Sequence, residues 1–136
     1  MMKPAKTIAL LAVLAATISC GGNVNTPNLL TVSGKWSFAL TSSVEGQANY
    51  TGIAQLTQVN NTVTGKMVLN NAPCATTATI TGAVNGYNVT FQITEGGQVV
   101  TLIGTVNSVF ESMSGTYSAP ATGCLSGDSG SWSAGG

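Results

Sequence analysis

Few side chains in this chain can take part in catalysis or bind a metal, and their types limit the functions that the protein can have. Cys20, Cys74 and Cys124 are the three cysteines, and there are four carboxylates but no histidine among the 136 residues. Without histidine, a histidine base and a histidine metal ligand are both excluded. The four lysines do not form the basic stripe that nucleic-acid binding requires, so we expect no nucleic-acid partner.

Three of the carboxylates, Glu45, Glu95 and Asp128, fall in or beside expected loops at one end of the fold. Three acids around one opening could bind a cation, because hard ions take carboxylate oxygens as ligands. Their spacing matches no calcium loop. We therefore favour the simpler interpretation, in which polar loops carry the few charges of a soluble domain, and we expect no metal and no cofactor.

A short segment, Gly127-Asp128-Ser129-Gly130, resembles the sequence around the reactive serine of chymotrypsin-like proteases. That mechanism needs a base to take the proton of the serine, and the chain has no histidine. A retaining glycosidase could in principle use Glu45 and Glu95, but nothing in the sequence fixes their separation. We interpret the serine segment as a turn into the last strand, and we expect no catalytic residue and no enzyme activity.

Four aromatic residues are expected to point inward near the same end: Phe38, Tyr50, Phe91 and Tyr117. They could line a pocket for an apolar or sugar-like small molecule. Eight-stranded barrels either fill with side chains or hold one small ligand. The many inward aliphatic residues favour a filled interior here.

Eight expected strands position these residues, at about 34–41, 48–59, 62–69, 78–84, 87–94, 98–106, 109–118 and 128–134. Abundant Thr and Val, together with Asn-rich turn pairs, favour an all-β domain. Seven strands carry a glycine in a mostly apolar face, where sheets bend or close into barrels. These glycines are Gly34, Gly52, Gly65, Gly82, Gly104, Gly115 and Gly130. The strand 87–94 alternates instead, with Tyr87, Val89, Phe91 and Ile93 inward.

The links between strands are of two kinds. Asn60-Asn61, Asn85-Gly86 and Asn107-Ser108 are two-residue links of the kind found in tight hairpins. They alternate with the links 42–47, 70–77, 95–97 and 119–127. Because successive links of a meander lie at opposite ends, the three tight links should form a closed end and the other four a loop end. Cys74 and Cys124 both fall at the loop end, which predicts a disulfide between them.

Pairing of the first and last strands would close the meander and bring Trp36 and Trp132 together at the closed end. The sequence therefore predicts an eight-stranded antiparallel up-and-down β-barrel. It resembles the barrels of lipocalins and streptavidin in architecture only. A β-sandwich with the same hairpins is the alternative.

The N-terminus indicates a cellular address. Lys3 and Lys6 precede an apolar run at 7–18. This run is shorter than the roughly 20 residues that a membrane-spanning helix needs. We therefore expect the segment 1–19 to be a secretory signal peptide. Its end, Thr17-Ile18-Ser19-Cys20, resembles the lipobox of bacterial lipoproteins. That resemblance implies cleavage before Cys20 and acylation of its sulfur and new N-terminus. The residue after the cysteine is Gly21, not the Asp that retains some lipoproteins at the inner membrane. The resemblance therefore implies attachment to the outer membrane.

Ordinary signal-peptidase cleavage after Ser19 is the alternative. The odd cysteine count favours lipidation, because an acylated Cys20 leaves Cys74 and Cys124 as a pair in an oxidising compartment. We expect a lipidated cysteine and flexible tether at 20–33, followed by a single barrel domain at 34–136.

These observations predict a secreted bacterial envelope lipoprotein, held at the membrane by its N-terminal lipid, on the periplasmic or the cell-surface face. Its barrel is expected to act as a binding or interaction module through the loop end, for a small molecule or an envelope protein. The alternative is a structural envelope lipoprotein with a filled barrel and no ligand. The tether begins at the closed end, so the loop end should point away from the membrane.

Overall fold

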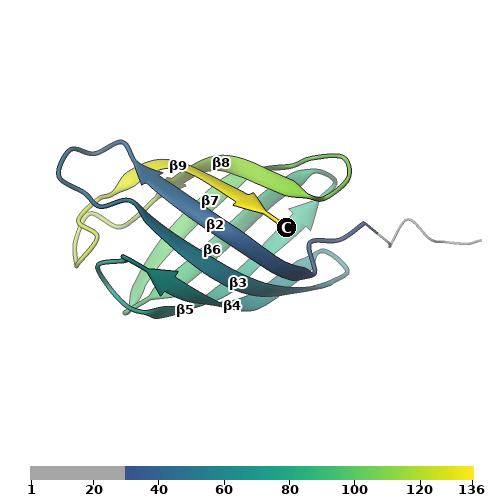
Figure 1. Cartoon of the computed structure of the whole chain (residues 1–136), viewed down its shortest axis with the longest axis horizontal. Coiled ribbons are helices and arrows are strands. Elements are labelled where there is room, and N and C mark those ends of the chain that lie inside the picture. Colours follow the sequence, from purple (N-terminus) through teal and green to yellow (C-terminus); the bar gives the residue numbers. More distant parts are fainter. Residues whose placement is uncertain (1–29) are drawn as a thin grey trace, which may run out of the picture. The chain divides into compact units, whose positions relative to one another are not determined.

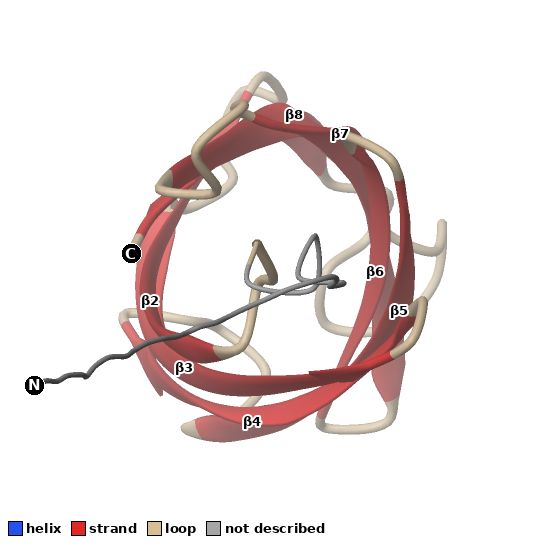
Figure 2. Ribbon diagram, turned by 90° about the vertical axis from the view of Figure 1, so that its right-hand side faces the viewer, coloured by secondary structure: helices blue, strands red, loops and turns tan. Residues whose placement is uncertain are grey.

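The computed structural model describes residues 30–136, in which eight antiparallel strands form a closed barrel (Figures 1 and 2). The strands are β2 (Gly34–Ser42), β3 (Tyr50–Val59), β4 (Thr62–Asn70), β5 (Thr77–Asn85), β6 (Asn88–Glu95), β7 (Gln98–Val106), β8 (Ser112–Ser118) and β9 (Ser129–Gly135). Each strand pairs with its neighbours in sequence, and β9 pairs with β2. The predicted barrel is confirmed, and the alternative sandwich is wrong. The described residues form no helix that could cross a membrane.

Residues Val32–Gly136 form one compact unit. The predictions for the segment 1–29, including the signal peptide, acylated Cys20 and most of the tether, lie outside the described residues.

The barrel interior is filled by side chains that alternate along each strand. In β6, for example, Val89, Phe91 and Ile93 are buried while the residues between them are exposed. Phe38, Phe91 and Trp132 form an aromatic cluster inside the barrel. The ring of Phe38 stacks on Trp132 at 5.7 Å, and Phe91 meets both rings edge-on at 6.2 and 6.0 Å. The expectation of a filled interior is therefore met at the centre.

The strand glycines allow neighbouring strands to approach closely. Gly104 and Gly115 face each other across β7 and β8. A Cβ atom on Gly104 would collide with the carbonyl oxygen of Ser114, and one on Gly115 would collide with that of Ile103. The tight contact is thus with the backbone of the adjacent strand rather than with side chains inside the barrel. Gly104 lies in phase with buried Leu102 and Val106, so the predicted place of this glycine on the apolar face is confirmed.

At the closed end, the segment before β2 packs over the interior. Val32 is fully buried, its N–H donates to Oε1 of Gln58 at 3.0 Å, and its carbonyl accepts from Nε1 of Trp36 at 2.8 Å. The predicted meeting of Trp36 and Trp132 is wrong. The register pairs Trp132 with Leu40, four residues along β2 from Trp36, so Trp132 lies deeper in the barrel.

Two of the three closed-end turns differ from the predicted ones. Asn85 pairs with Asn88, so the turn is Gly86-Tyr87, and Gly86 has a φ of 62° at the first central position, as in type II′ turns. Tyr87 therefore lies outside the strand and is exposed, which corrects its inward assignment. The last turn spans residues 107–111, because Oδ1 of Asn107 accepts from the N–H groups of Glu111 and Ser112.

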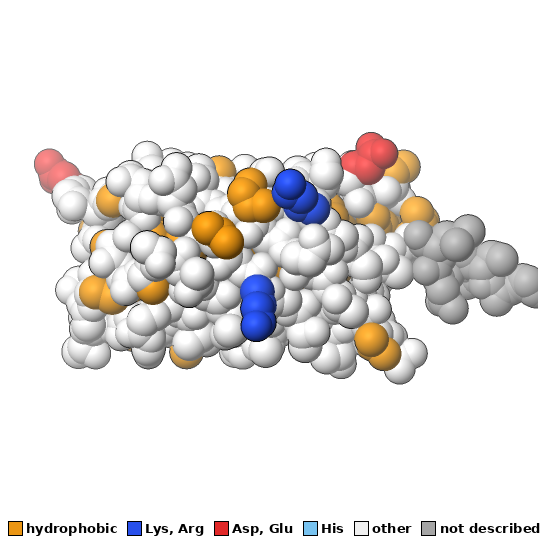
Figure 3. All heavy atoms as spheres, turned by 60° about the horizontal axis from the view of Figure 1, so that its bottom comes forward, with side chains coloured by type: hydrophobic (Ala, Val, Ile, Leu, Met, Phe, Trp, Pro, Cys, Tyr) orange, Lys and Arg blue, Asp and Glu red, His pale blue; other side chains and the backbone are white. Residues whose placement is uncertain are grey.

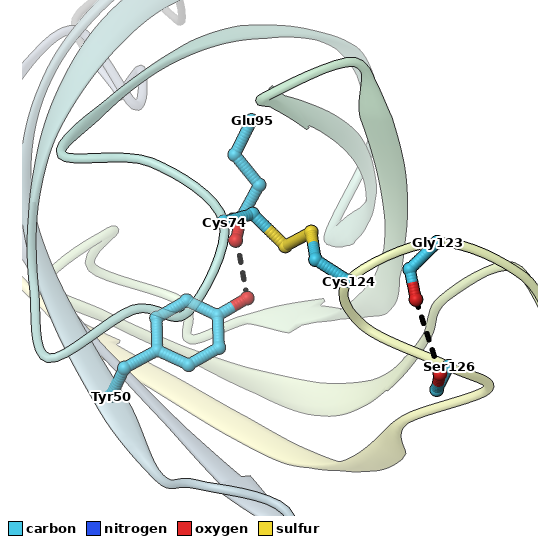
Figure 4. Close-up of a disulfide and its surroundings, with 6 residues drawn as sticks. All are labelled: Tyr50, Cys74, Glu95, Gly123, Cys124 and Ser126. Carbon is cyan, nitrogen blue, oxygen red and sulfur yellow. Dashed lines mark hydrogen bonds between the residues drawn. A yellow bond between two sulfur atoms is a disulfide. The ribbon is translucent and has the colours of Figure 1, made fainter.

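The loop end carries the connections 43–49, 71–76, 96–97 and 119–128, on the left in Figure 1. A disulfide joins Cys74 to Cys124, with a Cα–Cα distance of 5.7 Å, which confirms the predicted pairing (Figure 4). Leu125, from the same loop as Cys124, is buried in the core. The connections 71–76 and 119–128 are therefore tied to each other, and 119–128 is also anchored in the barrel.

Candidate functional site

Two pairs of tyrosine and carboxylate side chains form a buried polar layer under the loops. The hydroxyl of Tyr50 donates to Oε2 of Glu95 at 3.2 Å (Figure 4). The hydroxyl of Tyr117 donates to Oδ2 of Asp128 at 3.0 Å. Glu95 is completely buried and Asp128 is nearly so. The layer lies between the apolar interior and the loops.

Strand alternation explains why Glu95 points inward. It is the last residue of β6 and follows Val89, Phe91 and Ile93 at alternate positions, all of them buried. The sequence predicts Glu95 in the link 95–97, and this placement is wrong. Extending the alternation by one more step would have identified it as an inward residue. Gly96 and Gly97, both with positive φ, then form the two-residue turn to β7.

Asp128 is held by residues from three elements. Besides Tyr117 of β8, the hydroxyl of Ser42 at the end of β2 donates to Oδ1 of Asp128 at 2.5 Å. Asp128 directly precedes β9, and its own carbonyl accepts from the N–H of Ala119. Both carboxylate oxygens therefore have a partner, and the residue links the strands on either side of β9.

Burial dominates the electrostatics of the layer. Loss of hydration raises the pKa of Glu95, which the Asp128 charge also favours, and the hydrogen bond from Tyr50 opposes the shift only in part. Burial likewise raises the pKa of Tyr50, helped by Glu95, and raises the pKa of Tyr117 to about 12, helped by Asp128. The environment thus favours neutral tyrosines and a protonated Glu95.

One carboxylate oxygen in the layer has no hydrogen-bond partner among the described residues. Oε1 of Glu95 is buried and has no hydrogen-bond partner among the described residues, and the same holds for Oε1 of Gln98. Above Glu95, a Cβ on Gly96 would come within 2.6 Å of the carbonyl oxygen of Cys74. The loop carrying the disulfide is therefore packed directly against the turn that follows Glu95.

The predicted aromatic residues divide into two groups. Phe38 and Phe91 belong to the central cluster and are fully covered, so their assignment to a ligand pocket at the mouth is wrong. Alternation places each of them two inward positions below the polar layer on its strand, Phe38 below Ser42 and Phe91 below Glu95. Tyr50 and Tyr117 do lie at the loop end, but both are buried and their hydroxyl groups bind carboxylates.

The three loop-end acids do not surround one opening. Glu45 is exposed on the loop 43–49, whereas Glu95 and Asp128 are buried beneath the loops. Within residues 30–136, no three acidic, cysteine or histidine side chains come together in a way that could hold a metal ion.

Two surface hollows lie at the rim of the loop end. One, of about 510 Å³, is lined by hydroxyl-bearing side chains at the ends of β2, β8 and β9, including Thr41, Ser43 and Ser131, and reaches Tyr117. The other, of about 340 Å³, is lined mainly by amide and hydroxyl groups, including Asn49, Asn70 and Asn71, and reaches Tyr50. Each hollow therefore has a tyrosine of the buried polar layer among its lining residues.

Comparison with known proteins adds no family. No protein-family model matches the chain, and no curated protein matches its sequence.

Proposed function

We propose that this protein is a lipid-anchored component of the bacterial envelope whose barrel binds a polar ligand through its loop end. The observation that carries the proposal is the pair of rim hollows lined by hydroxyl and amide side chains. Their volumes, about 510 and 340 Å³, lie within the range of 300–1,000 Å³ that is typical of small-molecule sites.

The chemistry of the rim favours a ligand rich in hydroxyl and amide groups, such as an envelope glycan. Serine, threonine and asparagine both donate and accept hydrogen bonds, as sugar hydroxyl and acetamido groups do. The rim is also well ordered by its own bonds. Oδ1 of Asn49 accepts from the N–H of Ser42, and Nδ2 of Asn71 donates to the carbonyl of Asn49. Loops fixed in this way on a rigid scaffold lose little entropy on binding.

The proposal can be tested by adding a soluble chitotriose, as a glycan probe, to isotopically labelled protein and following the amide resonances. We expect shifts in the residues that line the two hollows, at 39–43, 49–51, 70–71, 116–117 and 129–131, and none at Asn60 or Tyr87 in the closed-end turns. Asn49→Ala should weaken binding at least threefold. Asn61→Ala is the matched control, because Asn61 is also exposed and also makes a side-chain bond, to Asn85. Shifts confined to the closed end would contradict the proposal.

A second candidate, a structural lipoprotein without a ligand, is favoured by the filled interior. The cluster of Phe38, Phe91 and Trp132 occupies the space that a barrel-type ligand would need. On this alternative, neither chitotriose nor other soluble envelope glycans shift any amide, and Asn49→Ala changes only stability.

A further inference from the structure

A hollow larger than either rim site, about 740 Å³, lies on the outer wall of the barrel, away from the loops. Its floor includes Ala54, Met67 and Ala78, which are adjacent inward residues on β3, β4 and β5. The remaining lining side chains point outward and form two rows across the strands.

The strand register defines these rows. The first runs through Lys35, Gln55, Lys66, Thr79 and Thr94, each directly opposite the next on the neighbouring strand. Neighbouring strands are about 4.8 Å apart, so the backbones of Lys35 and Lys66 are separated by about 10 Å. The second row contains Ile53, Val68 and Thr77, paired in the same way two residues along the strands. Ile53 is 45% exposed and Val68 is 64% exposed.

The charges of the described residues are unevenly distributed around this hollow. Lys35 and Lys66 are the only lysines in residues 30–136, both line the hollow, and neither has an ion-pair partner in that part of the chain. Figure 3 shows both lysines on one face, beside hydrophobic side chains, with the acidic side chains at the two ends of the barrel. The other two acids, Glu95 and Asp128, are buried. The hollow thus joins two uncompensated positive charges to an exposed apolar strip.

We propose that this groove, lined by Lys35, Lys66, Ile53 and Val68, binds a single-chain amphiphile with an anionic head. The head would lie between the two ammonium groups, where charge complementarity favours it. The alkyl chain would cover Ile53 and Val68, whose exposed apolar surface loses contact with water. A neutral polar ligand would leave the lysines unused, and a free anion would leave the apolar strip uncovered. The occupant therefore needs both parts in one molecule.

Decyl phosphate, used below its micelle concentration with the purified protein free of detergent, is the test probe. Calorimetry should show saturable binding, and amide shifts should map to β3, β4 and β5. Decyl maltoside, which has the chain but no charge, and inorganic phosphate, which has the charge but no chain, should each bind at least tenfold more weakly. Lys35→Gln and Lys66→Gln should each weaken decyl phosphate binding roughly fivefold, by analogy with a cation near an anionic lipid surface.

Matched variants separate the groove from general effects. Val68→Ser should reduce affinity, whereas Ile103→Ser, at another exposed apolar position on β7, should leave it unchanged. Glu111→Gln is the corresponding charge control. The proposal is overturned if decyl phosphate fails to bind, if decyl maltoside binds equally well, or if the double lysine variant binds normally. Lysine-dependent pelleting of Cys20→Ser protein with phosphatidylglycerol vesicles, without decyl phosphate binding, would instead assign the face to a membrane surface.

Discussion

Glu95 is the residue whose environment departs most from what its side chain prefers. A carboxylate that loses its hydration and has one oxygen unpartnered pays for burial unless it takes up a proton. Tyr50 supplies one hydrogen bond, and the nearby Asp128 charge makes ionisation still less favourable. The consequence is a stability that depends on pH.

The sign of that dependence follows from linkage. The pKa of Glu95 in the folded state is raised above its usual value of 4.5, so the folded state holds a proton that the unfolded chain releases. The stabilisation is fully present below pH 4.5 and is lost as the pH rises through the folded-state pKa. Urea unfolding followed from pH 4 upward should show this decline, and Glu95→Gln should remove it. Glu45→Gln, an exposed acid at the same end, should behave as the wild type does. An unchanged slope in Glu95→Gln would show that Glu95 is ionised in both states.

Because its pKa is raised, Tyr117 should cause a second loss of stability, at alkaline pH. Burial and Asp128 raise its folded-state pKa to about 12, whereas an unfolded tyrosine titrates near 10. The stability that this pair contributes is therefore present below pH 10 and falls as the pH rises from 10 to about 12. Tyr117→Phe should lessen this decline, measured by denaturant unfolding at pH 9 to 11. If its decline matches that of the wild type, Tyr117 is not the group responsible.

The close approach of β7 and β8 gives a prediction for Gly104. A side chain there would meet the carbonyl oxygen of Ser114, which belongs to the backbone and cannot rotate away. Gly104→Val should destabilise the protein by at least about 1 kcal/mol, the lower end of overpacking costs. Thr105→Val, at the exposed neighbouring position, should stay within about 0.5 kcal/mol. Equal denaturation midpoints for the two variants would contradict the assignment.

At the scale of elements, a glycine within a mostly apolar face predicted seven of the eight strands, and the alternation of apolar and polar residues predicted the remaining one. Burial inside a barrel enforces this period of two. Turns were harder to predict. In Asn85-Gly86, the glycine takes the first rather than the second central position, which moves Tyr87 out of the strand. At Asn107, side-chain bonds to two backbone N–H groups support a longer loop than the sequence suggested. Such choices depend on local hydrogen bonds that strand periodicity does not encode.

The candidate site was predicted less completely than the fold. Whether Phe38, Phe91 and Glu95 lie at the mouth, in the core or in a loop depends on where each strand ends. An error of one or two residues in a strand boundary changes that assignment. The disulfide was predictable, because Cys74 and Cys124 fall in links at the same end whatever the exact strand boundaries.

The disulfide should contribute measurably to stability. It joins residues separated by 50 positions, and closing a loop of this size is worth about 4 kcal/mol on the chain-entropy model. The double variant Cys74→Ala, Cys124→Ala should lose a large part of that value in equilibrium unfolding. Cys20→Ser removes a cysteine that takes no part in this disulfide and should keep the wild-type midpoint. If the double variant also keeps that midpoint, the disulfide does not stabilise the folded protein.

At the scale of the whole molecule, the prediction concerns its attachment. We expect Cys20→Ser to abolish acylation and to release the protein into a soluble fraction, because the lipid is its proposed membrane anchor. Mass spectrometry of the N-terminal peptide checks this directly. An unmodified mature Cys20 in the wild type would contradict the lipoprotein interpretation while leaving the barrel and its loop end unaffected.

Orientation connects the anchor to the proposed function. β2 begins at the closed end, with the turns Asn60-Asn61 and Gly86-Tyr87, and ends at the loop end. An anchor that precedes β2 would thus leave the loop end, with its rim hollows and disulfide, directed away from the membrane. The groove beside Lys35 and Lys66 would lie between these two ends.

Photo-crosslinking in living cells tests this account most directly, with a photoreactive amino acid placed at Ala121 in the loop end or at Asn61 in the closed end. Both positions are exposed, so folding should tolerate both replacements. We predict that the Ala121 variant crosslinks to envelope glycan or to an envelope protein, and that the Asn61 variant crosslinks to phospholipid. The reverse pattern, with phospholipid at Ala121 and a glycan or protein partner at Asn61, would contradict the assignment of the loop end as the binding end.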